Sequence, residues 1–89
     1  MAKSLKDKVT DAVKEAVGAD ARIELEDAPG NEIGGVVLSG SFATKSFGER
    51  QDLIWRHLDA HLNTNERSRV VFIVTDTPDE HEALKRANA

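Results

Sequence analysis

The chain has no cysteine and no tyrosine, and it contains only three phenylalanines and one tryptophan. Without cysteine it can form neither a disulfide framework nor a thiolate metal site. No apolar run approaches the roughly 20 residues that span a bilayer, and the charged N-terminal stretch lacks the apolar core of a secretory signal. The composition therefore predicts a cytoplasmic protein with no membrane segment, and it offers few aromatic rings for stacking nucleic-acid bases.

The chain is also short and acidic, with 89 residues and a net charge of −4. This length predicts a single domain, residues 1–89, with a modest core, and it excludes a large multi-layer enzyme. Because a negative protein is repelled by phosphate backbones, the charge disfavours a nucleic-acid role, although a local basic patch is still compatible with it.

The N-terminal segment has the pattern of an amphipathic helix. Ser4 with Asp7 forms a near capping box that places a helix start there, and Gly18 supplies a left-handed residue for the helix end. Between them, apolar residues recur at helical spacing at Leu5, Val9, Ala12, Val13, Ala16 and Val17.

A hairpin should follow. Residues 21–27 alternate between apolar and charged side chains, as a half-buried strand requires. The Pro29-Gly30 step fits a type II turn, so residues 33–39 should return as the antiparallel partner. Within that strand, the pair Gly34-Gly35 indicates a bulge or a close backbone approach, in preference to a phosphate-binding loop.

A small-residue turn and one amphipathic helix occupy residues 39–62. The apolar stripe of this helix is predicted to face the core and comprises Phe47, Gln51, Ile54, Trp55, Leu58 and Leu62. The turn ends in Lys45-Ser46, as a P-loop does, but the second glycine of that motif is missing. Nucleotide hydrolysis is therefore not expected.

The last third of the sequence has the pattern of a strand followed by a helix. Residues 63–65 form a polar break, and the continuous β-branched run at 70–74 favours a strand covered on both faces or central in its sheet. Thr77-Pro78-Asp79-Glu80 combines a cap, a first-position proline and a box-completing glutamate, which marks a helix start. The chain as a whole predicts an α+β fold of order αββαβα, with a three-stranded mixed sheet and helices largely on one face.

Residues able to carry chemistry are few. His57 and His61 have the i, i+4 spacing of two zinc ligands, but Leu58 stands where the zincin motif has its glutamate, and His81 lies on another element. No nucleophile with a base, and no pair of carboxylates, stands out. The sequence therefore predicts no catalytic site, no metal site and no cofactor.

One set of spaced residues resembles a known family. Phe42, Lys45, Arg50, Ile54 and Leu58, read as F-x-x-K-x-x-x-x-R-x-x-x-I-x-x-x-L, resemble the central signature of the BolA-like proteins. Val36-Val37-Leu38 precedes it as the second strand of that family does, and residues 77–80 are similar to the TP[ED]E start of its last helix. The resemblance implies a small α-β-β-α-β fold related to the type II KH domain.

The chain departs from that pattern where family members bind iron–sulfur clusters. Arg50-Gln51-Asp52 stands in place of Arg-His-Arg, so that Gln51 replaces the histidine associated with the cluster. The cysteine or histidine between the first two strands of the family is also absent, and an amide is a poor ligand for iron. Gln51 either bonds a backbone group of a nearby loop or faces a site.

The resemblance implies an accessory or regulatory protein that binds another protein, including a monothiol glutaredoxin in iron–sulfur cluster handling or in a stress response. Nucleic-acid binding through a KH-like sheet edge and helix is the alternative, although the GXXG loop of KH domains is missing. We predict a partner-facing surface at the joint between residues 42 and 50, with two arginines nearby. Arg50 could instead pair with Glu49, Asp52 or Glu26 and tie the helix to the hairpin. The predicted partner-binding residues are Phe42, Lys45, Arg50, Gln51, Arg67 and Arg69.

Overall fold

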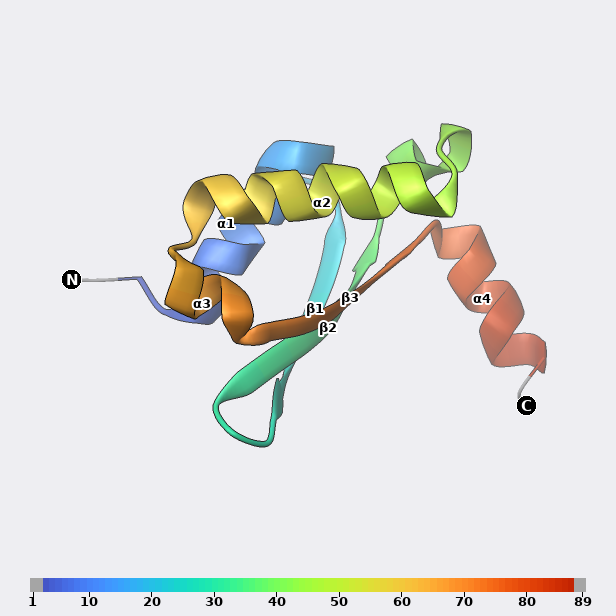
Figure 1. Cartoon of the computed structure of the whole chain (residues 1–89). Coiled ribbons are helices and arrows are strands. Elements are labelled where there is room, and N and C mark those ends of the chain that lie inside the picture. The colour runs from blue at the N-terminus through green and yellow to red at the C-terminus, as the bar shows by residue number, and fades with distance from the viewer. Residues whose placement is uncertain (1–2, 88–89) are drawn as a thin grey trace.

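The computed structural model describes residues 3–87 (Figure 1), and within them the strands form one three-stranded sheet. The strand order is β1-β2-β3, in which β1 pairs with β2 antiparallel and β2 pairs with β3 parallel. This mixed sheet confirms the predicted α+β class. The elements in chain order are α1 (Leu5–Val17), β1 (Arg22–Ala28), β2 (Glu32–Leu38), the 3-10 helix η1 (Gly40–Thr44), α2 (Phe47–His61), α3 (Thr64–Ser68), β3 (Val70–Asp76) and α4 (Pro78–Ala87).

The short helix α3 was not predicted, because residues 63–65 read as a polar break. Asn63 caps this helix: its side chain accepts a hydrogen bond from the Glu66 backbone N–H, and the Glu66 carboxylate accepts one from the Asn63 N–H. A polar residue that interrupts one helix can thus begin the next. The order is therefore αββααβα, with one helix more than the sequence indicated.

The predicted helix start and hairpin are confirmed. The Ser4 side chain accepts from the Asp7 N–H, and Gly18 has the positive φ of 104° expected where α1 ends. In the hairpin turn Gly30 has φ 79°, as a type II turn requires at that position. Asn31 also has a positive φ, 62°, which asparagine tolerates better than most residues.

The two glycines of β2 allow both a bulge and close packing. The pairing of β2 with β3 shifts between Ile33 and Gly34, which leaves Val71 without a partner. A Cβ on Gly34 would lie 2.1 Å from the Phe72 ring, and one on Gly35 would lie 2.7 Å from the Glu24 carbonyl oxygen. The side chain of Phe72 and the backbone of β1 therefore occupy the space that side chains would need.

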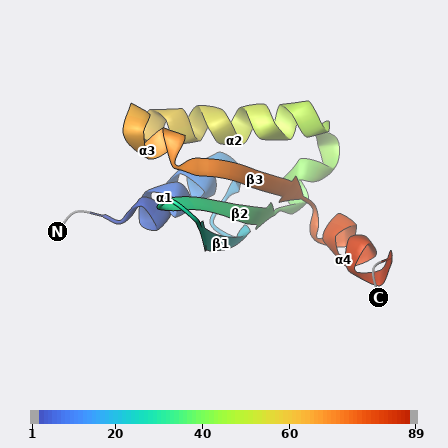
Figure 2. The ribbon, with the colours of Figure 1, turned by 60° about the horizontal axis from the view of Figure 1, so that its bottom comes forward.

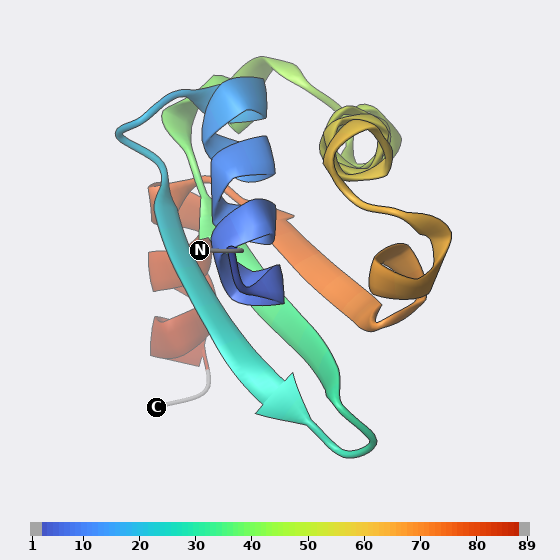
Figure 3. The same cartoon turned by 90° about the vertical axis from the view of Figure 1, so that its left-hand side faces the viewer.

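The core lies between the sheet and two helices. Helices α1 and α2 pack against each other over one face of the sheet, and α4 leaves the end of β3 and continues past the sheet (Figures 2 and 3). The strand β3 is at an edge, with Phe72 40% and Val74 38% exposed, so its predicted central or doubly covered position is wrong. The buried cluster comprises Val9, Ala12, Val13, Ile33, Val37, Phe42, Ile54, Leu58, Leu62, Val70 and Ile73.

The core-facing stripe of α2 is confirmed at Ile54 and Leu58, which are fully buried, but not at Phe47, which is 71% exposed. Side chains of a helix lean toward its N-terminus. A first-turn residue on the inner stripe therefore projects beyond the elements that cover the rest of the helix. None of the helices within residues 3–87 is long and apolar enough to cross a membrane.

Candidate functional site

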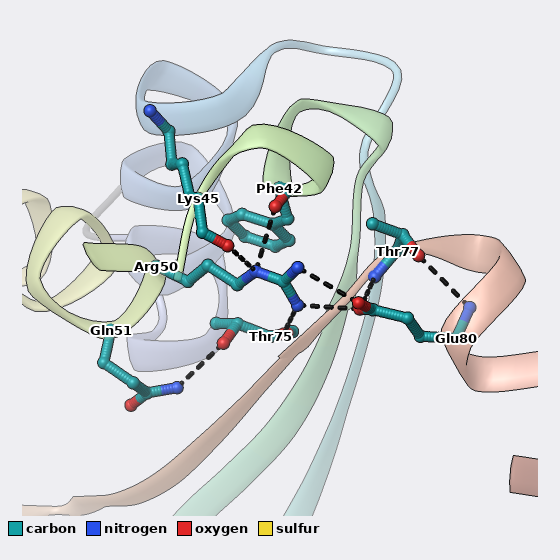
Figure 4. A network of polar contacts seen from close by, with 7 residues as sticks. All are labelled: Phe42, Lys45, Arg50, Gln51, Thr75, Thr77 and Glu80. Carbon is teal, nitrogen blue, oxygen red and sulfur yellow. Dashed lines mark hydrogen bonds and ion pairs between the residues drawn. The ribbon is translucent and has the colours of Figure 1, made fainter. Parts of the chain in front are cut away.

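Arg50 is the most buried charged residue at the joint between η1 and α2, with 9% exposure. Its Nε donates to the carbonyl oxygens of Phe42 and Lys45, both at 3.0 Å, and thereby fixes the turn in front of α2 (Figure 4). The guanidinium also lies 5.7 Å from the centre of the Phe42 ring, within the range of a cation–π contact. Arg50 thus holds the joint from inside.

The outer nitrogens of Arg50 extend the network to the end of the sheet and to α4. Nη1 donates to the Thr75 carbonyl at 3.1 Å and to Glu80 Oε1 at 2.7 Å, and Nη2 donates to Glu80 Oε2 at 3.1 Å. The Glu80 carboxylate accepts from the Thr77 backbone N–H as well. These bonds, from Arg50 first and Thr77 second, lower the pKa of Glu80 from its usual 4.5 to about 2.

Arg50 therefore does form an ion pair that ties α2 to another element, but with a partner that we did not predict. The expected candidates were Glu49, Asp52 and Glu26, which lie near it in sequence or on the hairpin. The partner is Glu80, thirty residues away on α4. The one sequence signal that marked Glu80 was its place in the capping box of the last helix, and that signal did not connect it with α2.

Gln51 bonds a strand and not a loop. Its Nε2 donates to the Ile73 carbonyl at 2.8 Å and to Thr75 Oγ1 at 3.0 Å, and its Oε1 accepts from Trp55 Nε1 at 2.9 Å. The amide is therefore engaged at both of its polar ends. Together, Arg50 and Gln51 bond two carbonyls of the edge strand β3, which makes those groups less available to an added strand.

The side chains present do not fit an iron–sulfur cluster. Gln51 stands where the resemblance places a histidine ligand, and its amide is committed to β3 and Trp55. The chain has no cysteine, and residues 3–87 contain no group of three or more His, Asp or Glu side chains arranged to hold a metal ion. The donor set for such a cluster is thus missing from the described part of the chain.

The two histidines of α2 each have another partner. His57 Nδ1 lies 2.9 Å from the Leu53 carbonyl oxygen, one turn earlier in the same helix. His61 Nε2 lies 2.5 Å from Glu15 Oε2 on α1 and links the two helices. Their i, i+4 spacing therefore serves helix contacts in this structure.

Arg67 and Arg69 lie far from the joint, so the expectation that they flank it is wrong. They precede β3, whose start pairs with the start of β2, whereas the joint follows the end of β2. The Arg67 guanidinium lies 4.0 Å from the centre of the Trp55 ring and bonds Asp59, and Arg69 donates to the Asn31 carbonyl in the hairpin turn. The parallel pairing of β2 and β3 separates the two sets of residues along the length of the sheet.

At the joint, most of the predicted partner-facing side chains are turned inward. Phe42 is fully buried and Arg50 nearly so, while Lys45 is half-buried. The largest exposed apolar side chain there is Phe47, at 71%, which our sequence pattern had assigned to the core. The outer surface of the joint, which we call the joint surface, consists of Ala43, Thr44, Lys45, Ser46, Phe47 and Gly48.

A cavity of about 320 Å³ lies between α4 and the start of β1. Its lining includes His81 and four residues that carry charge, Asp20, Arg22, Glu82 and Lys85. Carboxylates and cations occur on both walls, so the lining has no charge preference for one class of ligand.

Two solved structures have the same fold. A BolA protein homologue from Coxiella burnetii aligns with a TM-score of 0.64 and 22% identity, over 92% of this chain and 99% of that one. A Bol-like protein from Babesia bovis aligns with a TM-score of 0.60 and 18% identity, over 94% of this chain and 96% of that one. No protein-family model and no curated protein matches the chain. The likeness confirms the BolA-like fold that the resemblance implied.

Proposed function

We propose that this protein is a BolA-like accessory or regulatory protein of the cytoplasm, which acts by binding another protein and catalyses no reaction itself. The fold likeness supports the BolA-like part of this proposal. The observation that carries the binding role is Phe47, a large apolar side chain that is 71% exposed on the joint surface. Exposed aromatic anchors on rigid scaffolds are typical centres of protein interfaces.

Hydrogen bonds from beneath hold the backbone of the joint surface in place. Arg50 holds the carbonyls of Phe42 and Lys45 from inside, and Ser46 caps α2 with Glu49 in a complete capping box. A preorganised surface loses less conformational entropy when a partner binds. Phe47 can therefore act as an anchor, with the half-buried Lys45 offering a cation beside it.

The candidate partner is a monothiol glutaredoxin, as the BolA-like resemblance implies. Because the described residues offer no set of cluster ligands, we propose that this chain recognises the partner and supplies no ligand to a cluster. A nucleic-acid partner is less favoured, since the net charge is −4 and Arg67 and Arg69 already bond groups of the chain itself.

Calorimetric titration with a recombinant monothiol glutaredoxin, free of cluster, tests this proposal. The parent protein should bind, and Phe47→Ser should weaken binding at least tenfold, about 1.4 kcal/mol. Leu84→Ser is the matched control, because Leu84 is 55% exposed on α4, away from the joint. Absence of binding by the parent, or equal binding by Phe47→Ser and the parent, would refute the proposal.

A further inference from the structure

The second face of the sheet has no helix over its centre. Helices α1 and α2 cover the opposite face. Helix α4 leaves the end of β3 (Figure 2) and lies on the side of the sheet away from α1 (Figure 3), with a cavity between it and the start of β1. Phe72 and Val74 on β3 are 40% and 38% exposed. Val36, on the central strand β2, is partly exposed. We call this surface the back face; its residues are Glu24, Glu26, Val36, Phe72 and Val74.

The strand register orders the back face into an apolar strip with a border on β1 formed by Glu24, Glu26 and, at the end next to the cavity, Arg22. Glu24 pairs with Val36, which pairs with Val74, and in the next row Glu26 pairs with Gly34, which pairs with Phe72. Alternate residues of a strand point to the same face, so these rows lie side by side. The Phe72 ring covers Gly34, because a Cβ at this position would lie only 2.1 Å from the ring.

The carboxylates of the border are available to a partner. Glu26 forms no ion pair among residues 3–87, and Glu24 has only a loose contact, at 3.4 Å, with the exposed Arg22. A partner that covers the apolar strip would place its flanking side chains beside these two carboxylates. Lysine or arginine at those positions would satisfy them.

From this arrangement we propose that the back face docks an amphipathic helix of a partner protein, with an apolar stripe over Val36, Phe72 and Val74 and basic residues beside Glu24 and Glu26. The strip is two strands wide, about 10 Å, which matches the diameter of one helix. A second copy of the chain would bring its own net charge of −4, so charge complementarity favours a basic partner over a dimer. This surface is separate from the joint surface and does not depend on its role.

Two synthetic helical peptides of about 18 residues test the proposal. Both carry leucine along one stripe, and their remaining positions are lysine in one peptide and glutamate in the other. In a titration followed by amide NMR shifts, the lysine peptide should perturb Val36, Phe72, Val74 and Glu26, and the glutamate peptide should not. Equal effects of both peptides, or shifts confined to the joint surface, would overturn the proposal.

Charge variants separate the effect of the two border glutamates on peptide binding from the effect of the protein's net charge. Glu26→Lys should weaken binding of the lysine peptide at least fivefold, whereas Asp52→Lys, on the exposed side of α2, should change it less than twofold. Both variants raise the net charge by the same amount. Val74→Ser should also weaken binding, with Leu84→Ser as its control. If the two charge variants weaken peptide binding equally, the border glutamates do not select a basic helix. If sedimentation shows a dimer that the lysine peptide does not dissociate, the back face holds a second copy of the chain. Either result would contradict the proposal.

Discussion

Arg50 on α2 and Glu80 on α4 form a two-point ion pair, with N–O distances of 2.7 and 3.1 Å, although they are thirty residues apart in the chain. Glu80 also completes the capping box of α4 with Thr77. This one carboxylate therefore fixes the start of the last helix and its attachment to the joint. Its ionisation should be visible in the stability of the whole domain.

The first prediction concerns acid. The pKa of Glu80 is about 2 in the folded protein, below its usual 4.5, so the ionised group stabilises the fold above about pH 4.5. This contribution should be lost as the pH falls from 4.5 toward 2. Glu80→Gln should therefore be less stable than the parent at pH 7, and the gap in the free energy of unfolding should close over that interval.

Other carboxylates also have a lowered pKa, such as Glu49 with its bonds to Ser46 and Glu66 with its bonds to Lys8 and Asn63. Urea unfolding of the parent and of Glu80→Gln at each pH isolates the share of the pH-dependent stability that is due to Glu80. A gap between the two proteins that stays constant from pH 7 to pH 2 would contradict the assigned role of the ion pair.

The second prediction concerns the core. Leu58 is fully buried in α2, so Leu58→Ala should lower the free energy of unfolding by about 2 to 5 kcal/mol. Leu84→Ala, at a 55% exposed position on α4, should change it by less than about 0.5 kcal/mol. Equal midpoints of chemical denaturation for Leu58→Ala and the parent would mean that α2 packs in another register.

The third prediction compares the two neighbouring glycines of β2. Gly35→Ala should destabilise the fold by about 1 to 3 kcal/mol, because the new methyl group meets the Glu24 backbone carbonyl, which cannot move without shifting β1. Gly34→Ala should cost less, since the Phe72 ring that it meets is 40% exposed and can swing outward. Thermal unfolding of the two variants checks the order, and the reverse order would contradict the register.

The fourth prediction concerns metals. With no cysteine and with Gln51 committed to β3, the purified chain should be colourless and contain far less than one iron or zinc per molecule. Elemental analysis after mild chelation measures this directly. A near-stoichiometric metal content would show a site built from other residues.

Local signals in the sequence were enough to place most of the fold. The caps at Ser4 and Thr77 and the turn at Pro29-Gly30 depend on neighbouring residues, and each was predicted. The edge position of β3 was not, because a continuous apolar run is the same whether its second face is covered or open. The Asn63 cap of α3 was missed because polar residues that end one helix also begin another.

The candidate site was harder to predict because its contacts join distant parts of the chain. Arg50 and Glu80 meet only because β2 and β3 are parallel and carry the joint and α4 to the same end of the sheet. The exposure of Phe47 depends on where the neighbouring elements end, which helical spacing does not encode. Helical periodicity therefore assigned it to the core, and only the tertiary arrangement placed it on the joint surface.

The central claim, a protein partner held at the joint surface, is tested most directly by mapping that partner on the chain. Amide NMR shifts of the isotope-labelled protein, titrated with a cluster-free monothiol glutaredoxin, report which residues it covers. We predict the largest shifts at Ala43 to Gly48, and their loss in Phe47→Ser while the remaining spectrum stays folded. No shifts at saturating partner, or shifts at other surfaces with the joint unchanged, would contradict the claim.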